Sequence, residues 1–373
     1  MSEPHSILRR ARPLLVARLA GAIVTVAVPM VLARVLVPAS YGTFKQAWLL
    51  ASTLFLVLPM GITQSLYYFV PREPERRDRF VAQALWATTA VGVLATGLIL
   101  AARPLVAAHF RNPELTRLLP WVAAFTGFIL AGAALDLAWN ATGRIGAAAL
   151  VRVGTEVARA AGMIVGAIVT GSVVGVFAGI LATAIGRAII TWIALGRAHG
   201  LAVELGAFRR QVAYALPFGV AFLVLIPQQQ FHLYAVGAAV SASAFAIYAI
   251  GTVQLPIVDV LYTPISELLQ LGIAQAEREG RPHRAGLAIF HEAVLQLAFA
   301  FLPVAALLVV VAPDLIGLLF SDAYLAATPI FRVAVLSVAL SALPLDGVMR
   351  ARAQNRFMLR LSAGKLAGTV PLV

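Results

Sequence analysis

Ten apolar stretches, each long enough to cross a lipid bilayer, make up most of this 373-residue chain. A transmembrane helix needs about 20 mostly apolar residues. Stretches that meet this requirement lie at roughly 13–37, 46–70, 80–102, 119–141, 147–170, 173–196, 212–236, 243–270, 286–312 and 329–349. Hydrophobic residues make up 61% of the chain and charged residues 12%, against about 45–50% and 25% in soluble domains. No soluble core could bury so much apolar surface, so the pattern predicts an all-α polytopic membrane protein.

Arginines are concentrated in every second gap between these stretches. The N-terminal segment and the even-numbered gaps together hold Arg9, Arg10, Arg12, Arg72, Arg76, Arg77, Arg79, Arg144, Arg197, Arg209, Arg210, Arg278, Arg281, Arg284, Arg350, Arg352, Arg356 and Arg360. The odd-numbered gaps hold only Arg103, Arg111 and Arg117. Because short basic loops stay in the cytoplasm, the N-terminus and the even gaps are predicted to be cytoplasmic. The same rule explains the net charge of +13 without a nucleic-acid partner.

A weak internal repeat indicates two lobes. Long outer loops at about 103–118 and 313–328 are each followed by a stretch that contains Leu-Asp, at Leu135-Asp136 and Leu345-Asp346. The spacing predicts two pseudo-symmetric six-helix lobes in the same orientation, a common plan among transporters. The N-terminal lobe would span residues 1–200 and the C-terminal lobe residues 201–373. The second lobe would hold four complete helices and part of an eleventh, so we expect the chain to be truncated.

Six arginines lie inside the apolar stretches, where a charged side chain costs roughly 2.5–3.5 kcal/mol on insertion scales. These residues are Arg18, Arg34, Arg152, Arg159, Arg187 and Arg332. Arg34 and Arg332 lie near the outer ends, where long side chains reach the interface. Arg18, Arg152 and Arg187 lie in the inner half of their stretches. Guanidinium groups bind phosphate through paired, charge-assisted hydrogen bonds, so these three arginines predict a site for a phosphate or pyrophosphate head group.

Arg152, Glu156 and Arg159 form one stripe on the fifth apolar stretch, because they are spaced at i, i+4 and i+7. Two interpretations are open. The stripe is either a self-neutralising row of ion pairs that packs against another helix, or a substrate site. In the second case Glu156 orients both arginines and leaves one net positive charge facing a cavity.

Other polar residues at depth are Asp136, Asp259, Gln228 and Gln229. A carboxylate in a membrane can carry a proton or bind a coupling ion, and the alternative is pairing with a neighbouring arginine. Pro227 removes a backbone hydrogen bond and predicts a kink in its helix. Gln228 and Gln229 follow it, and they would either line a polar cavity or form hydrogen bonds across helices.

Enzyme signatures are missing from the sequence. The chain contains no cysteine, which excludes disulfides and thiolate metal sites. It also lacks a glycine-rich phosphate loop, metal-ligand spacing and a nucleophile with a matching base. We therefore expect a protein without enzymatic activity, cofactor or metal.

Two motifs near the N-terminus resemble a known family. They are Leu32-Ala33-Arg34-Val35-Leu36-Val37-Pro38-Ala39-Ser40-Tyr41-Gly42 and Gly61-Ile62-Thr63-Gln64-Ser65-Leu66-Tyr67-Tyr68-Phe69-Val70-Pro71-Arg72. They resemble the first two helices of the oligosaccharide flippases, called Wzx-type or polysaccharide-transport proteins. This family belongs to the multidrug/oligosaccharidyl-lipid/polysaccharide exporter superfamily. Leu319-Phe320-Ser321-Asp322-Ala323-Tyr324 resembles the outer loop before helix ten in such proteins.

The resemblance implies a MATE-like, inverted-V bundle in the bacterial inner membrane. Its implied work is moving undecaprenyl-pyrophosphate-linked oligosaccharide to the outer leaflet for exopolysaccharide, capsule or O-antigen synthesis. The expected partners are this lipid-linked oligosaccharide and membrane lipids, with a polysaccharide polymerase and chain-length proteins as further candidates. Alternatives are a MATE-type drug or metabolite exporter, a lipid II flippase, and a non-transporting scaffold of a polysaccharide assembly complex.

Overall fold

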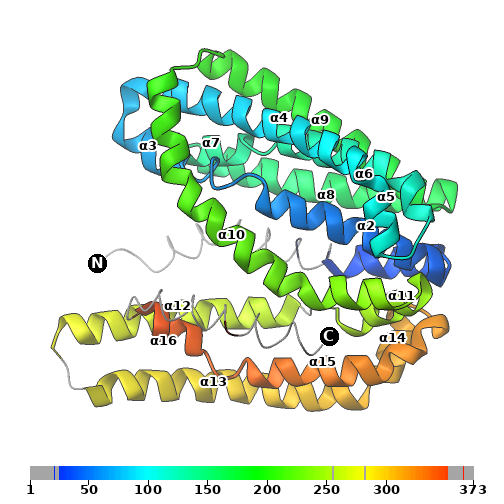
Figure 1. Cartoon of the computed structure of the whole chain (residues 1–373). Coiled ribbons are helices and arrows are strands. Elements are labelled where there is room, and N and C mark those ends of the chain that lie inside the picture. The colour runs from blue at the N-terminus through cyan, green and yellow to red at the C-terminus, as the bar shows by residue number, and fades with distance from the viewer. Residues whose placement is uncertain (1–20, 22–24, 254–255, 281–282, 352–363, 365–373) are drawn as a thin grey trace. The chain divides into compact units, whose positions relative to one another are not determined.

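The computed structural model of the chain is built from helices joined by short turns (Figure 1). The structure describes residue 21 and residues 25–253, 256–280, 283–351 and 364. Its helices are α2 (Pro38–Val57), α3 (Leu66–Arg72), η1 (Pro74–Arg76), α4 (Arg77–Ala101), α5 (Arg103–His109), α6 (Glu114–Ala131), α7 (Leu135–Ala141), α8 (Ile145–Thr170), α9 (Val173–His199), α10 (Leu205–Ala239), α11 (Ala242–Gly251), α12 (Pro256–Arg278), α13 (His283–Val310), α14 (Ala312–Leu319), η2 (Asp322–Ala327), α15 (Thr328–Leu340) and α16 (Leu345–Ala351).

Six helical segments of the described chain are long and apolar enough to cross a membrane. They are Pro74–Ala101, Glu114–Ala141, Ile145–Thr170, Val173–His199, Arg284–Val310 and Asp322–Met349. Helix α10 makes a seventh if its two arms, which are bent by 44° between Leu223 and Gln228, count as one span. The bend lies at Pro227, where the sequence predicts a kink. The chain is thus a multi-pass membrane protein.

Four of the predicted stretches, 46–70, 119–141, 243–270 and 329–349, are each divided between two helices rather than forming one continuous helix. The stretch 46–70 is divided between α2 and α3 by a series of turns at residues 58–65. Met60 and Gly61 have positive φ values of 48° and 76° in these turns, a conformation that ends a right-handed helix. The stretch 243–270 is divided between α11 and α12, and Pro256 stands at the start of α12, where proline is tolerated.

Contacts within the chain divide it into two compact units, Met1–Ala246 and Ile247–Val373. In the first unit α8 packs along α9, α6 packs against α4 and α9, and α10 packs against α2. In the second unit α12 packs against α13 and α16, and α13 packs against α15. Helix α10 therefore groups with the first unit. The pseudo-symmetric lobe boundary near residue 200 remains a prediction.

The pair α8–α9 is held together by glycines that let the two backbones approach closely. A Cβ atom added to Gly179 would lie 2.0 Å from the carbonyl oxygen of Gly162, and one added to Gly166 would lie 2.0 Å from the carbonyl oxygen of Gly175. Because real Cβ atoms do not come within 3.0 Å of such atoms, any side chain there would force the helices apart. Small residues at helix contacts are how membrane helices gain van der Waals packing.

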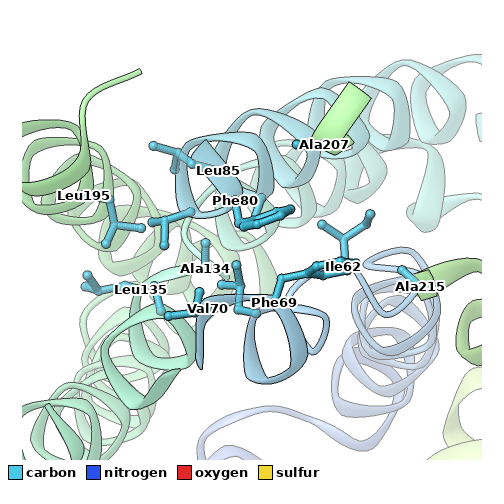
Figure 2. Close-up of a cluster of buried hydrophobic side chains, with 14 residues drawn as sticks. Ile62, Phe69, Val70, Phe80, Leu85, Ala134, Leu135, Leu195, Ala207 and Ala215 are labelled. Atoms are coloured by element: carbon cyan, nitrogen blue, oxygen red, sulfur yellow. The ribbon is translucent and has the colours of Figure 1, made fainter. Parts of the chain in front are cut away.

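A buried apolar cluster joins the ends of several helices in the first unit (Figure 2). It includes Phe69 and Val70 of α3, Phe80 of α4, Leu135 of α7 and Leu195 of α9. The rings of Phe69 and Phe80 are stacked with centroids 4.7 Å apart. This cluster fixes the positions of α3, α7 and α9 at the end of the bundle that the arginine pattern assigns to the cytoplasm.

Helix α10 is tied to the first unit near both of its ends by buried amides. Gln211 Nε2 donates to Ser65 Oγ over 2.9 Å, and Gln46 Nε2 of α2 donates to the Gly237 carbonyl over 3.1 Å. Asn112 Nδ2 in turn donates to Gln46 Oε1 over 2.7 Å. Gln46 and Gln211 are fully buried, where hydrogen bonds are costly to lose. These bonds explain why α10 groups with the helices that precede it.

Candidate functional site

A largely buried ion pair joins Arg187 of α9 and Asp136 of α7 in the first unit. Arg187 Nη2 donates to Asp136 Oδ1 over 2.8 Å, and the two side chains are only 13% and 12% exposed. Arg187 Nη1 also donates to Thr155 Oγ1 of α8 over 2.6 Å. Its Nε donates to the Gly132 carbonyl over 2.9 Å. Arg187 thereby connects three helices and the break between α6 and α7.

The sequence favours this arrangement because the chain breaks at Gly132. Helix α6 ends at Ala131 and α7 begins at Leu135, so the Gly132 carbonyl lies outside both helices and is free to accept a side-chain hydrogen bond. Thr191 Oγ1 provides a second, longer one of 3.3 Å. A Cβ atom on Gly132 would lie 2.9 Å from Arg187 Cγ, so a larger residue would displace the arginine. Asp136 thus pairs with an arginine, which was one of its two predicted roles.

The stripe on α8 divides into a neutral pair and one open arginine. Arg159 forms an ion pair with Glu156 one turn away, and its guanidinium carbon lies 5.5 Å from the ring centre of Trp48 on α2. Glu156 makes no ion pair with Arg152 in the described part of the chain. Arg152 is exposed. The net positive charge of the stripe therefore resides at Arg152.

The position of Arg152 along α8 places it well inside the span. It follows the start of the helix at Ile145 by seven residues, or about 10 Å at a rise of 1.5 Å per residue. Its neighbour Val151 packs against the apolar cluster of Figure 2. Arg152 is therefore held next to this buried cluster, at the end of the bundle that the arginine pattern assigns to the cytoplasm, while its own side chain stays exposed.

The structure says less about the other residues predicted for the site. Arg18 lies outside the described residues, and the structure places Asp259 on α12 without describing its side chain. Gln228 is half-buried and Gln229 is exposed, both directly after the bend in α10. In the parts of the chain that the structure describes, no three His, Asp or Glu side chains gather in a way that could hold a metal ion.

A polar contact between the start of α3 and the end of α7 escaped the sequence-based predictions. Asn140 Nδ2 donates to the hydroxyl oxygen of Tyr67 over 3.3 Å, and Tyr67 is 48% exposed. Gln64, three residues before Tyr67, is also exposed. The three-residue spacing of Gln64 and Tyr67, two polar side chains in an otherwise apolar stretch, was the signal in the sequence that could have revealed this surface.

A second missed feature is a charged clamp at the ends of the spans. Arg210 donates to both carboxylate oxygens of Glu73, over 2.7 and 2.8 Å. Arg76 lies 3.6 Å from Glu73 and 3.7 Å from Glu204. The hydrogen bonds from Arg210 hold the pKa of the Glu73 carboxyl below its usual value. The clamp fastens the first turns of α10 and the preceding residue Glu204 to the segment between α3 and α4.

These observations define a class, the multi-pass helical membrane protein with the fold of MATE transporters. The structure resembles the inward-facing conformation of a multidrug resistance MATE family transporter of the MOP superfamily, with a TM-score of 0.62, 16% sequence identity and coverage of 95% of this chain and 86% of that chain. For the outward-facing conformation of such a transporter the TM-score is 0.56 at 17% sequence identity, with 91% of this chain and 84% of that chain covered. For a MATE structure in a bent conformation the TM-score is 0.52 at 16% sequence identity, with 92% of this chain and 81% of that chain covered. At these identities the likeness concerns the fold alone.

The family of the chain follows from a comparison of its sequence with protein families. Residues 31–329 match the polysaccharide biosynthesis protein family, and the chain belongs to it. None of the curated proteins compared matches the chain. The resemblance of its N-terminal motifs to the oligosaccharide flippases, and the predicted MATE-like fold, are both confirmed.

Proposed function

We propose that this protein moves an undecaprenyl-pyrophosphate-linked oligosaccharide from the inner to the outer leaflet of the bacterial inner membrane. Its family supports a role in polysaccharide synthesis, and its fold is one that transporters use. The N-terminus would lie in the cytoplasm, as the arginine-rich gaps predict.

The observation that carries the proposal is the exposed, unneutralised Arg152. Two other candidate arginines, Arg159 and Arg187, already have carboxylate partners, so a pyrophosphate would have to compete with Glu156 or Asp136 for them. Arg152 has no such competitor among the described residues. A planar guanidinium offers two parallel N–H donors to phosphate oxygens, and its depth of about 10 Å suits a head group loaded from the cytoplasmic leaflet.

In this proposal the paired arginines have different tasks from Arg152. Arg187 and Asp136 hold three helices together, and the Glu156–Arg159 pair supports the stripe from one turn away. Arg152 and Arg18 receive the pyrophosphate. The glutamines after the α10 bend and Asp259 remain candidates for contacts with the polar substrate or for ion coupling.

The test is transbilayer movement in vesicles that contain the full-length protein and the lipid-linked oligosaccharide extracted from the cells that produce it. Charge-assisted hydrogen bonds contribute about 1.5–3 kcal/mol, so Arg152→Ala should slow movement by about 10- to 150-fold. Arg152→Lys should recover part of the rate, because it keeps the charge and loses the paired donors.

Arg144→Ala is the matched control, since Arg144 is an exposed arginine in the turn before the same helix. It should leave the rate within about twofold, as expected for a residue that only sets topology. Equal rates for Arg152→Ala and the wild type would refute the pyrophosphate site. A wild-type protein that moves no lipid-linked sugar, but expels organic cations, would instead favour a drug exporter of the same fold.

A further inference from the structure

An exposed polar face at the start of α3 is not needed for binding pyrophosphate. Within residues 61–70 only Gln64 and Tyr67 are exposed, while their neighbours are buried or half-buried. The Tyr67 N–H donates to the Gln64 carbonyl over 3.1 Å, so the two residues are the ends of one turn that leads into α3. Polar side chains are costly against lipid, so this face is better matched to water or to a polar ligand.

Hydrogen-bonding capacity on this face is only partly used. Tyr67 accepts a hydrogen bond from Asn140 Nδ2 over 3.3 Å, so its own hydroxyl proton is left to donate and Asn140 Oδ1 is left to accept. Gln64 Oε1 accepts from Thr63 Oγ1 over 2.9 Å, which leaves the Gln64 amide N–H groups to donate. The structure records no other partner for these groups among its described residues.

The same apolar cluster supports this face and Arg152. Leu66, which precedes Tyr67, belongs to the cluster, and so does Ala138, one helical turn before the end of α7. Val151, which precedes Arg152, packs against it. Phe69, Val70 and Leu135 of this cluster are seen in Figure 2. The residues next to the polar face and next to Arg152 therefore pack in the same apolar cluster of the first unit.

Depth along the helices is also similar. Tyr67 lies five residues before the basic residue Arg72 at the end of α3, or about 8 Å. Arg152 lies about 10 Å from the start of α8. A ligand whose charged group contacts Arg152 would therefore present the atoms attached to that group at the level of Tyr67.

We infer that Gln64, Tyr67 and Asn140 bind the sugar hydroxyls of the glycan next to the pyrophosphate, so that this face selects the glycan-bearing lipid over the bare lipid. The inference rests on the proposed function. A sugar hydroxyl both donates and accepts hydrogen bonds, and Tyr67 O–H and Asn140 Oδ1 offer it a donor and an acceptor side by side. The half-exposed ring of Tyr67 adds an apolar surface for the C–H face of a sugar ring.

The experiment compares two lipids in vesicles that contain the full-length protein: the cell-extracted undecaprenyl-pyrophosphate-linked oligosaccharide and undecaprenyl pyrophosphate without sugar. The readout is the ratio of their transbilayer rates. Tyr67→Phe, which removes the donor, and Asn140→Leu, which removes the acceptor, should each lower this ratio by about 2- to 10-fold, the range that one net hydrogen bond contributes. Tyr67→Leu should lower it further because it also removes the ring.

Tyr68→Phe is the matched control. Tyr68 is the next residue, but its ring is stacked on Tyr214 with centroids 4.4 Å apart, so its substitution should leave the ratio unchanged. Equal losses of both rates in the Tyr67 and Asn140 variants would show a purely structural role and overturn the inference, as would an unchanged ratio. If the wild-type protein moved neither lipid, the proposed function itself would fail and this inference with it.

Discussion

Replacing Arg187 by alanine should remove the protein from the membrane rather than merely abolish transport. The substitution leaves the Asp136 carboxylate, whose side chain is only 12% exposed, without its partner. It also removes the hydrogen bonds to Thr155 and to the Gly132 carbonyl. Breaking a buried ion pair on one side costs about 3–5 kcal/mol. That cost corresponds to a fall of roughly 150- to 4,000-fold in the ratio of folded to unfolded protein.

A double replacement separates the loss of a partner from the loss of a positive charge. In Asp136→Asn with Arg187→Gln, no charge remains buried, and replacing a buried ion pair by neutral groups of similar size is often close to neutral in stability. The double variant should therefore be much more stable than Arg187→Ala. Thermal unfolding in detergent, followed by tryptophan fluorescence, and protein abundance in membranes measure the difference. Arg152→Ala, at an exposed arginine without a carboxylate partner, serves as the control and should keep wild-type stability.

A double variant as unstable as Arg187→Ala would refute this reasoning, because the penalty would then not come from the uncompensated aspartate. The transport rate of the stable double variant also shows whether the charge of Arg187 is needed for the substrate. Movement at the wild-type rate would limit Arg187 to a structural role, whereas a stable but inactive double variant would require its charge for the substrate.

Three further predictions concern the helix packing and the clamp around Glu73. Gly179→Ala should destabilise the protein by about 1–3 kcal/mol, because the added Cβ would lie 2.0 Å from a backbone oxygen. Gly154→Ala is the control for the same thermal unfolding assay and should be neutral, because its Cβ would meet nothing within 4 Å. Gln46→Leu should lower the unfolding temperature by leaving the buried Gly237 carbonyl without its donor, a loss of about 1–3 kcal/mol. Glu73 has a lowered pKa in the folded protein, so its contribution to stability is present above the ordinary glutamate value of about 4.3 and is lost as the pH falls through the lower folded value. Unfolding temperatures measured from pH 6 to pH 3 should therefore fall less in Glu73→Gln than in the wild type.

Hydropathy predicted the membrane-spanning helices well because the thickness of the bilayer sets their length and apolar character locally. The stretches around 80–102, 147–170 and 173–196 are helices whose bounds differ from the prediction by a few residues, since length and apolar character alone define a span. The stretches 46–70, 119–141, 243–270 and 329–349 are each divided between two helices. Their breaks depend on backbone conformations, such as that of Met60, which hydropathy does not record.

The sequence predicted which residues belong to the candidate site, but only partly which of them form ion pairs with one another. Spacing along α8 placed Glu156 on the face of both arginines, and the choice of Arg159 over Arg152 depends on side-chain conformation rather than on spacing. The partner of Asp136 could not be read from the sequence, because Arg187 is 51 residues away. Asn140 and Tyr67, 73 residues apart, were hidden for the same reason.

The separation of Asp136 from Arg187 has a consequence for how the protein is made. Ribosomes add about 5–20 residues per second, so the 51 intervening residues take roughly 3–10 seconds. During this interval α7 carries an aspartate whose partner has not yet been synthesised, and such a residue costs about 2.5–3.5 kcal/mol in a membrane. The helices α6 to α9 must therefore be retained together at the insertion machinery until Arg187 emerges. The ion pair makes this stretch of the chain a single unit of membrane insertion.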